Sequence, residues 1–564
     1  MLLGPVALAM VITGCSSSNG GPSGQGGSAP SGGAVGSGGR PGGGGASASA
    51  GSGIGGSVSV AGSVSGGSTS GGATGGSGAA AGAMPVGGMT GAGGAPSTGG
   101  ATGGAGAPPA GGASGAGGAA SSTTVTVHLD QTRQTIEGFG LNTALASGTV
   151  PWDTLYGTTG ADAIGLSIVR VAMTSSGGLS GDVSGAKSHN VKIIGSAWTP
   201  PANCKDNNNT QKGGHLKTSC YDSYSTTIAN FAKAQGLYAM SAANEPDFAS
   251  CGASIGPPCN GDYDSAVYTA NEMVAFVNVL GPKLKAAGVK LIAPEPSEWV
   301  HLWSNTSATG STVSGHPNSS DPLKCGCFGT STSCAATCTS GDGYDYGHWL
   351  AKDATAWAAI DIIGVHEYDT QHAEPWPSDV DGGKRTKEIW ETEASGVMYW
   401  PEQGPSSDIN NGIAVAGWIH SALTVGEASA WLYWWYKAVG SNDNEGLVLQ
   451  NSSALTKRYY TLGNYSKFVR PGSSRLDVSG SIPTNVLLSA YKTSDGNVVI
   501  VAINKGTAAA TVPIAISGGT GPASCTPNVT SASANLAAGT AVAVTGGSLS
   551  ASLAAATVTT FVCK

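Results

Sequence analysis

Hydrophobic and polar positions follow two different patterns along the chain, and the longer region alternates strand-like runs with helical segments. Between residues 138 and 435, short apolar runs are separated by segments of helical length such as 221–235 and 268–286. Near-continuous apolar strands that alternate with helices are typical of a parallel sheet buried on both faces. Eight such units predict an α/β fold, a (β/α)8 TIM barrel over residues 138–470. The expected strands are 138–142, 167–173, 191–197, 237–243, 289–293, 361–366, 388–392 and 429–435.

The second region, residues 471–564, contains short strands separated by Gly, Ser and Asn turns, without a helical period. Its clearest strands are 486–491, 497–503, 510–516 and 556–562. This pattern predicts an antiparallel β side domain, a β-sandwich. Residues 123–128 also read as a strand, and we expect segment 123–137 to join the same domain from the other end of the chain.

Composition separates a third region at the N-terminus. Residues 1–122 hold 44 of the 91 Gly, one charged residue (Arg40), and no Trp, Tyr or Phe. A Gly/Ala/Ser-rich segment buries too little apolar surface to offset the chain entropy lost on folding. We therefore predict a disordered linker or tether over residues 16–122.

The first fifteen residues resemble an export signal. The apolar stretch is too short to span a membrane, and small residues precede Cys15, as in the bacterial lipobox whose Cys is lipidated. We expect residues 1–15 to be a lipoprotein-type signal peptide that anchors the exported chain at the cell surface or outer membrane, or precedes its release. An ordinary signal peptide is the alternative, and the usual Lys/Arg at the start is missing.

Ten further cysteines suggest disulfide bonds, since an even number in an exported chain favours pairing. Proximity in sequence predicts Cys204–Cys220, Cys251–Cys259 and Cys525–Cys563. The remaining four form a cluster that fits two bridges or, less well by its spacing, a zinc site: Cys325, Cys327, Cys334 and Cys338.

Charge narrows the choice of partner. The formal net charge is −8, and no basic run exists anywhere in the chain. Binding to nucleic acid needs clustered Lys and Arg, so nucleic acid is excluded as a partner. We expect a monomer that acts on a neutral polysaccharide, needs no cofactor or metal, and meets a membrane only through a lipid anchor.

Two Glu residues stand at the carboxyl ends of predicted strands, where barrel enzymes place their chemistry. Glu245 follows the fourth strand within Asn244-Glu245-Pro246, and Glu393 ends the seventh. Glycoside hydrolysis needs two carboxyl groups, one to donate a proton and one ionised. Asn-Glu-Pro could also be a simple helix-start turn. Glu391 competes with Glu393, because residues two apart share a face of a strand.

The globular region resembles glycoside hydrolase family 30, in particular its bacterial xylanase subfamily 8. Nine short stretches carry the resemblance in order: Gln134–Gly140, Leu166–Val171, Ala197–Pro201, Asn244–Asp247, Asp361–His366, Trp390–Glu393, Tyr433–Tyr436, Ser466–Gly472 and Ser489–Lys492. The resemblance implies a (β/α)8 barrel with a β side domain built from both chain ends. It also implies retention of configuration, with Glu245 as acid/base and Glu393 as nucleophile.

The resemblance also implies substrate-binding residues. Asn244 matches the Asn that bonds the sugar 2-hydroxyl, and Arg170 matches the Arg that keeps the nucleophile ionised. The remaining candidates lie at strand ends, where they could contact sugar or simply pack: Trp198, His366, Tyr368, Trp435 and Tyr436.

Two departures affect the expected substrate. In the glucuronoxylan-specific members an Arg and an aromatic residue bind glucuronate, but Val439 and Ser395 stand here, and Lys437 is a poor substitute. The segment 295–348 is also longer than in the family and either walls the cleft or is a surface excursion.

These observations favour an endo-β-1,4-xylanase without strict dependence on glucuronate. An endo-β-1,6-galactanase or β-1,6-glucanase is the alternative within the family, and a non-catalytic surface carbohydrate-binding protein is the alternative of another class.

Overall fold

The structure is a computed structural model that describes residues 124–145, 149–211, 213–248, 264–303, 344–368, 373–395, 408–437, 445–449 and 453–564. Several predictions concern residues outside these ranges: the signal peptide with Cys15, the tether 16–122, the Cys251–Cys259 bridge, the cysteine cluster at 325–338, and Val439. Within the described ranges, no helix combines the length and apolar character that crossing a membrane requires.

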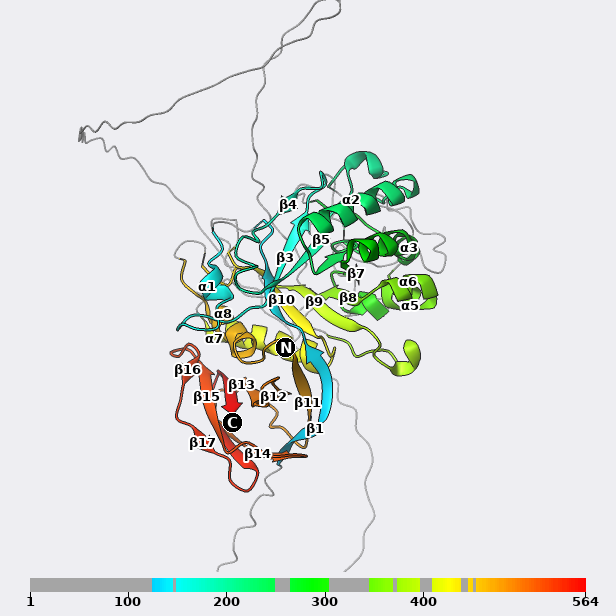
Figure 1. The fold of residues 1–564 in the computed structure, drawn as a ribbon. Coiled ribbons are helices and arrows are strands. Elements are labelled where there is room, and N and C mark those ends of the chain that lie inside the picture. The colour runs from blue at the N-terminus through cyan, green and yellow to red at the C-terminus, as the bar shows by residue number, and fades with distance from the viewer. Residues whose placement is uncertain are drawn as a thin grey trace, which may run out of the picture. The chain divides into compact units, whose positions relative to one another are not determined.

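Eight parallel strands close into a barrel, which confirms the predicted fold class (Figure 1). The first strand pairs with the second on one side and with the last on the other, and this closes the cylinder. A short strand β4 (Leu179–Ser180) adds antiparallel to β3. The barrel strands are β2 (Gly138–Asn142), β3 (Ile168–Met173), β5 (Lys192–Ala197), β6 (Ala239–Ser241), β7 (Lys290–Pro294), β8 (Ile362–His366), β9 (Glu388–Ala394) and β10 (Ala430–Trp435).

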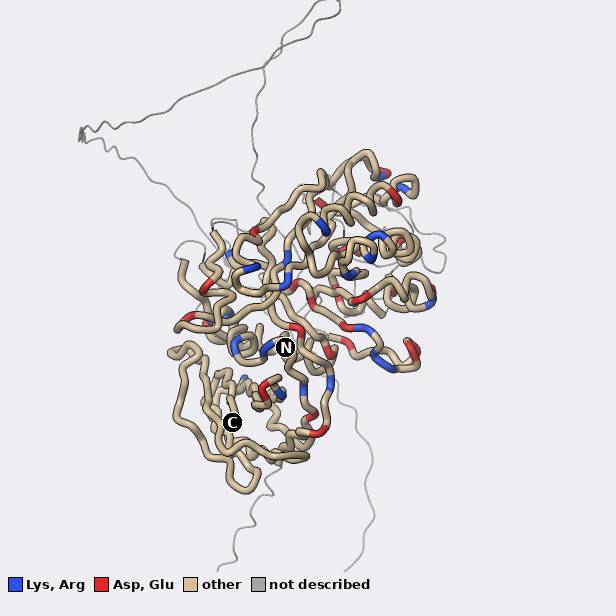
Figure 2. Tube along the Cα trace, in the orientation of Figure 1, with Lys and Arg blue, Asp and Glu red and all other residues tan. Residues whose placement is uncertain are grey.

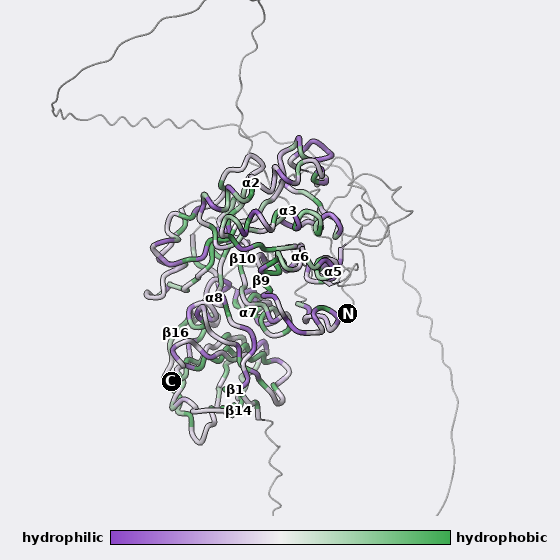
Figure 3. The backbone as a smooth tube through the Cα atoms, turned by 45° about the vertical axis from the view of Figure 1, so that its right-hand side comes forward, coloured by the Kyte–Doolittle hydropathy of each residue, from purple (hydrophilic) through white to green (hydrophobic). Residues whose placement is uncertain are grey.

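Apolar packing rather than charge holds the barrel together. Charged residues are sparse along the tube (Figure 2), and hydrophobic segments gather in the middle of the barrel around β9 and β10 (Figure 3). One fully buried cluster draws side chains from seven of the eight strands: Ile168, Ile194, Ala239, Ile292, Ile362, Trp390, Ala430 and Leu432. Because strand side chains alternate, this layer fills the barrel and fixes the positions of the strand ends.

Helices cover the outside of the barrel. The helix α3 has a capping box, in which Thr269 and Glu272 satisfy each other's backbone N–H groups, and it ends at Gly288 in the left-handed conformation (φ 74°). The described helices are α1 (Trp152–Leu155), α2 (Tyr221–Ala234), α3 (Ala270–Ala287), α4 (Val300–Trp303), α5 (Tyr346–Lys352), α6 (Ala354–Ala359), α7 (Ile409–Thr424) and α8 (Lys457–Ser466). Short 3₁₀ turns are η1 (Ala202–Cys204), η2 (Thr218–Cys220) and η4 (Asp381–Gly383).

The side domain is a separate, sandwich-like β structure. Its strands are β1 (Val125–Ile136), β11 (Ser473–Ser479), β12 (Val486–Lys492), β13 (Val498–Asn504), β14 (Ala510–Ser517), β15 (Ser524–Thr530), β16 (Ala537–Ala538), β17 (Val542–Ala543), β18 (Ser548–Leu553) and β19 (Thr557–Cys563). As expected, β1 joins this domain: it pairs antiparallel with β11 and parallel with β14 (Figure 1). Every second residue of β18 is buried, although Ser and Ala dominate that strand.

Polar contacts join the side domain to α8 and to the end of α7. The Asn464 side chain donates to the Asn528 backbone oxygen at 3.0 Å and Thr560 Oγ1 donates to the Asn464 backbone oxygen at 2.6 Å. Arg475 forms an ion pair with Glu427 at 2.8 Å. The barrel and the side domain therefore share a buried, hydrogen-bonded boundary.

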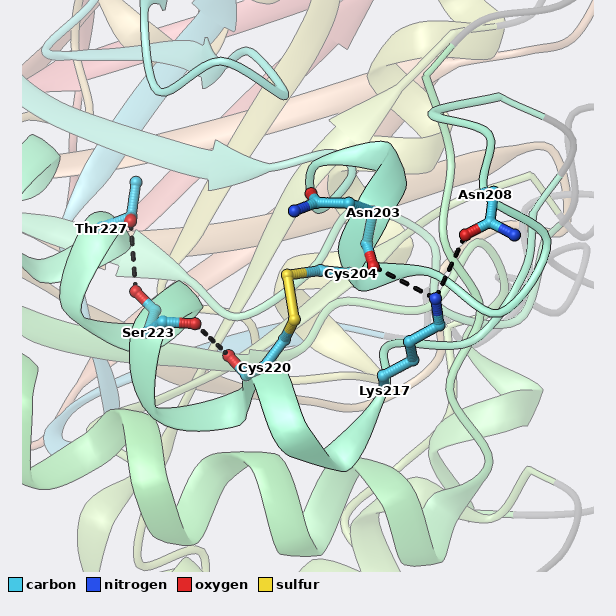
Figure 4. The surroundings of a disulfide bond; sticks show 7 residues. All are labelled: Asn203, Cys204, Asn208, Lys217, Cys220, Ser223 and Thr227. Atoms are coloured by element: carbon cyan, nitrogen blue, oxygen red, sulfur yellow. Dashed lines mark hydrogen bonds between the residues drawn. A yellow bond between two sulfur atoms is a disulfide. The ribbon is translucent and has the colours of Figure 1, made fainter.

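Two predicted disulfides are confirmed. Cys204 and Cys220 join η1 to η2 ahead of helix α2, where Lys217 also bridges the Asn203 backbone oxygen and Asn208 (Figure 4). Cys525 and Cys563 join β15 to the last strand, β19. Both bridges connect elements that already pack together, so they limit the freedom of the unfolded chain without bending the fold.

Candidate active site

The structure brings Glu245 and Glu393 together at the carboxyl ends of the barrel strands. Glu245 follows β6, and Glu393 lies near the end of β9. One oxygen of each carboxyl group lies within 4.8 Å of the other, and a ring nitrogen of His366 lies within the same limit of both. Both carboxyl groups are buried, so their charges act on each other and on their neighbours with little screening by water.

Arg170 on β3 connects the candidate residues. Its Nη1 donates to Glu393 Oε2 at 2.7 Å, and its Nη2 donates to Asn244 Oδ1 at 2.6 Å. The side chain is fully buried, so it has exchanged its hydration for these partners. Because Arg170 engages Asn244 Oδ1, the amide nitrogen of Asn244 is the group that can donate to a sugar hydroxyl.

His366 is the last residue of β8, and Tyr368 stands two positions after it. Their side chains contact the carboxyl groups of Glu245 and Glu393. His366 Nδ1 lies 3.1 Å from Glu245 Oε1 and 3.8 Å from Glu393 Oε1. The Tyr368 hydroxyl donates to Glu393 Oε1 at 2.7 Å. Glu393 therefore has a cationic partner on one oxygen and a neutral hydroxyl donor on the other.

A third carboxylate, Glu295, completes the cluster, and it was not predicted from the sequence. It stands directly after β7 and is fully buried. Ser196 Oγ donates to Glu295 Oε2 at 2.7 Å, and Arg170 Nη2 donates to the same oxygen at 3.3 Å. His366 Nε2 lies 3.9 Å from Glu295 Oε1. The signal available in the sequence was its position, an acidic residue at the end of a predicted barrel strand.

The electrostatics of the cluster are set by burial and by the two cations. Burial opposes ionisation of Glu295, but Arg170 and His366 outweigh it and lower the pKa of Glu295 to about 2. Burial likewise opposes the charged form of His366, yet Glu393 and Glu245 raise the pKa of His366 to about 10. For Glu393 burial prevails over His366 and Arg170, and its pKa is raised. Glu295 and His366 are therefore charged at neutral pH.

Glu391 and Glu393 lie on different sides of β9, so the expectation that they share a face is wrong. The pairing of β9 shifts register between Glu391 and Glu393 against β8, and between Glu391 and Ala394 against β10, which marks a β-bulge. The bulge turns Glu393 towards Arg170, whereas Glu391 Oε2 accepts from Trp299 Nε1 at 3.2 Å. Neighbouring Glu367, whose pKa burial raises to about 7, interacts with Glu391 away from the two catalytic candidates.

Asp247 fixes the segment that carries Glu245. Its carboxylate accepts from the Ser297 backbone nitrogen at 2.9 Å and from the Ser297 hydroxyl at 2.8 Å, and it pairs with His301 Nδ1 at 2.7 Å. Glu245 itself has φ 45°, and its backbone nitrogen donates to the Glu295 carbonyl at 3.1 Å. These bonds hold Glu245 in a left-handed conformation that a Glu rarely adopts.

The predicted aromatic candidates are more buried than open sugar platforms would be. Trp198 stacks on Trp434 with ring centroids 5.7 Å apart and is 7% exposed. Trp435 is 1% exposed, and its indole nitrogen donates to the Ala144 carbonyl at 3.1 Å. Tyr436, just beyond β10, is half-buried. This burial favours a packing role for Trp435, and sugar binding by Trp198, Trp435 and Tyr436 stays a prediction.

A fourth carboxylate lies beside the candidate nucleophile, over the ends of β9 and β10. Glu445 is buried and accepts a hydrogen bond from Ser395, two residues after Glu393. The Tyr433 hydroxyl fixes the Glu445 backbone by donating to its carbonyl at 2.6 Å. Lys437 instead donates to Ser453 Oγ at 3.0 Å. A buried carboxyl group therefore lies in contact with Ser395.

Three ligand atoms in the cluster are close enough together to hold a cation. They belong to Glu245, His366 and Glu393. A metal ligand nitrogen must be unprotonated, however, and the raised pKa of His366 keeps the ring charged at neutral pH. Arg170 also neutralises Glu393 from within the barrel. The cluster is suited to proton transfer and to charge stabilisation rather than to metal binding.

Comparisons with known proteins agree with this fold. Residues 472–561 match the glycosyl hydrolase family 30 beta sandwich domain. The chain is 29% identical over 467 residues to the glucuronoxylanase XynC of Bacillus subtilis strain 168, covering 78% of this chain and 92% of that protein.

Solved structures of the same class are also similar. The subfamily 8 xylanase Xyn30A of Clostridium acetobutylicum has a TM-score of 0.59 and 27% identity, covering 78% of this chain and 99% of that chain. A family 30 endoxylanase of Clostridium papyrosolvens C71 has a TM-score of 0.57 and 27% identity, covering 78% of this chain and 100% of that chain. These similarities indicate a glycoside hydrolase. Within that class, the chain is similar to glycoside hydrolase family 30 in its C-terminal β domain and to xylanases of that family over 78% of its length.

Proposed function

We propose that this chain is a retaining endo-β-1,4-xylanase in which Glu245 is the acid/base and Glu393 the nucleophile. The separation of the two carboxyl groups carries the proposal, because one oxygen of each lies within 4.8 Å of the other. Retaining glycosidases hold these groups about 5–5.5 Å apart, whereas inverting enzymes need about 6.5–9.5 Å to admit a water. The names of the xylanase relatives support xylan over β-1,6-linked galactan or glucan as the substrate.

The proposed reaction proceeds in two displacements. In the first, a Glu393 oxygen forms a bond to the anomeric carbon, the glycosidic C–O bond breaks, and Glu245 gives its proton to the leaving oxygen. In the second, Glu245 takes a proton from water, whose oxygen bonds to the anomeric carbon and releases Glu393. Arg170 stabilises the Glu393 carboxylate, and the Asn244 amide nitrogen is free to donate to the sugar 2-hydroxyl as charge develops.

Product analysis of the wild-type protein tests this assignment. We expect xylan to be cut into oligosaccharides of several sizes, and proton NMR to show the β-anomer as the first product. An α-anomer formed first would contradict retention. Cleavage of β-1,6-galactan or β-1,6-glucan without cleavage of xylan would favour the alternative substrates, and binding without any cleavage would favour a non-catalytic protein.

We further propose that cleavage does not require glucuronate side groups. Glu445, held by Ser395 beside the candidate nucleophile, repels a second carboxylate placed near it. Lys437 bonds to Ser453 and offers no compensating cation there. In the same assay, we expect linear xylo-oligosaccharides and glucuronoxylan to give kcat/KM values within about tenfold, a gap of about 1.4 kcal/mol. Activity confined to glucuronate-bearing xylan would refute this proposal.

Export and lipid anchoring through Cys15 complete the proposal. The disulfides Cys204–Cys220 and Cys525–Cys563 suit an oxidising compartment. We expect the full chain, produced in a bacterial host, to incorporate radiolabelled palmitate and to sediment with membranes. The Cys15→Ala variant should lose both properties. Equal labelling of Cys15→Ala and wild type would exclude this residue as the lipidation site.

A further inference from the structure

We propose that Glu295 is a positioning residue that balances the charge of the active site and thereby sets the pH range in which Glu245 and Glu393 work. The inference deepens the proposed hydrolase function and rests on it. Glu295 lies behind the two candidate catalytic groups, and the hydrogen bonds that hold it come from Ser196 and Arg170 inside the barrel. Its role is therefore exerted through these neighbours and not through the sugar.

Glu295 shares both of its cationic partners with the proposed catalytic carboxyl groups. Arg170 places Nη1 2.7 Å from Glu393 and Nη2 3.3 Å from Glu295. His366 places Nδ1 3.1 Å from Glu245 and Nε2 3.9 Å from Glu295. Each cation thus stands between Glu295 on one side and a proposed catalytic group on the other.

The charges in the cluster balance only if Glu295 is counted. Arg170 and His366 carry two positive charges, and ionised Glu295 and Glu393 carry two negative ones. The sum is zero when Glu245 holds the proton that it must donate to the leaving group. A buried cluster resists net charge, because little water is present to screen it. Glu295 therefore favours the protonation state that starts the reaction.

Several neighbouring elements contribute to this balance. Among the residues that the structure describes, the titratable groups that face the cluster come from β3, β6, β8, β9 and the segment after β10, and they are Arg170, Glu245, His366, Tyr368, Glu393 and Glu445. Tyr368 and Glu445 do not supply the negative charge of Glu295 to the two cations. Burial and Glu393 raise the pKa of Tyr368 well above its ordinary value, so its hydroxyl stays neutral, and Glu445 lies beyond Ser395. Glu295 remains the carboxylate in contact with Arg170 that takes no part in bond making.

Loss of the Glu295 charge should move both limbs of the pH–rate profile in the same direction. In Glu295→Gln the two cations are left with less negative charge, which favours the ionised form of the carboxyl groups that still face them. We expect the whole bell of kcat/KM against pH to shift by about one unit towards acid, measured on whichever neutral glycan the wild type hydrolyses. An unmoved bell with a uniform loss of rate would overturn the proposal.

A matched variant separates charge from position. Ser196→Ala removes the hydrogen bond to Glu295 Oε2 and leaves the Glu295 charge in place. We expect the pH dependence of kcat/KM in Ser196→Ala to match that of the wild type. A shift as large as that of Glu295→Gln would show that position, not charge, causes the effect, and would overturn the proposal. Thermal unfolding of each variant checks that it folds.

A measurement on the wild type covers the case in which Glu295→Gln does not fold. Carboxyl signals can be followed by ¹³C NMR between pH 4 and pH 8, with Glu295 assigned from the signal lost in Glu295→Asp. We expect Glu295 to remain ionised throughout, and titration within this window would overturn the proposal. A wild type that hydrolyses no glycan would instead contradict the proposed function, and the NMR result would still stand on its own.

Discussion

Replacing Glu393 by Gln is expected to lower kcat on xylan by at least about 10⁴-fold, equivalent to about 5.4 kcal/mol of transition-state stabilisation. The amide cannot form the glycosyl ester, and it also removes the charge that Arg170 binds at 2.7 Å. The size of the amide nearly matches that of the acid, so binding of xylan should persist. Steady-state kinetics together with affinity electrophoresis on xylan measures both quantities.

Glu391→Gln is the matched control for Glu393→Gln, because both residues lie in β9, both are buried, and the chemical change is the same. The β-bulge places Glu391 against Trp299 and away from the catalytic candidates. We expect its kcat to remain within about tenfold of the wild-type value. If Glu391→Gln abolished turnover and Glu393→Gln did not, the assignment of the nucleophile would be reversed.

Arg170→Gln is expected to have the second largest effect, and it should appear in stability as well as activity. The substitution leaves Glu295 and Glu393 buried without the guanidinium that contacts both. Removing one partner of a buried ion pair typically costs about 3–5 kcal/mol of unfolding free energy. Chemical denaturation at pH 7 measures this loss, and kcat should fall as well, since the nucleophile is harder to ionise.

The loss should depend on pH with a definite sign. The lowered pKa of Glu295, about 2 when folded against about 4.3 in an unfolded chain, contributes stability above pH 4.3 that disappears as pH falls towards 2. The difference in unfolding free energy between wild type and Arg170→Gln should therefore become smaller as pH falls from 4.3 towards 2. As a control, Arg133→Gln breaks the partly exposed pair with Asp477 and should cost at most about 1 kcal/mol. Equal costs for both variants would contradict the electrostatic account of Arg170.

The barrel was predictable because its strands are runs of β-branched and aromatic residues with little competing signal. Strands β3, β5 and β8 begin within one residue of their expected starts. In the side domain β15 and β18 were missed, because Ser, Thr and Pro dilute their hydrophobic alternation. Burial of Leu549 and Leu553 in β18 depends on strands elsewhere in the domain, which a local pattern cannot reveal.

The site was predictable to the extent that strand ends carry its chemistry. Position alone pointed to Glu393 over Glu391, but the β-bulge that separates them arises from pairing with two neighbouring strands and leaves no local trace in the sequence. Glu295 was overlooked because its contacts come from β3, β5 and β8, which are distant in sequence. Glu445 was overlooked because the segment after β10 has no regular period from which a direction could be read.

Strand β1 makes the side domain discontinuous along the chain. Arg133 on β1 and Asp477 on β11 form an ion pair across 344 positions of sequence. During synthesis, β1 therefore leaves the ribosome long before either of its partner strands. Its backbone hydrogen-bonding groups remain unpaired until β11 and β14 have been synthesised. A fragment that begins at residue 471 would lack a central strand, and one that ends at residue 470 would carry an unpaired one. The smallest unit expected to fold on its own is thus the whole span from β1 to β19.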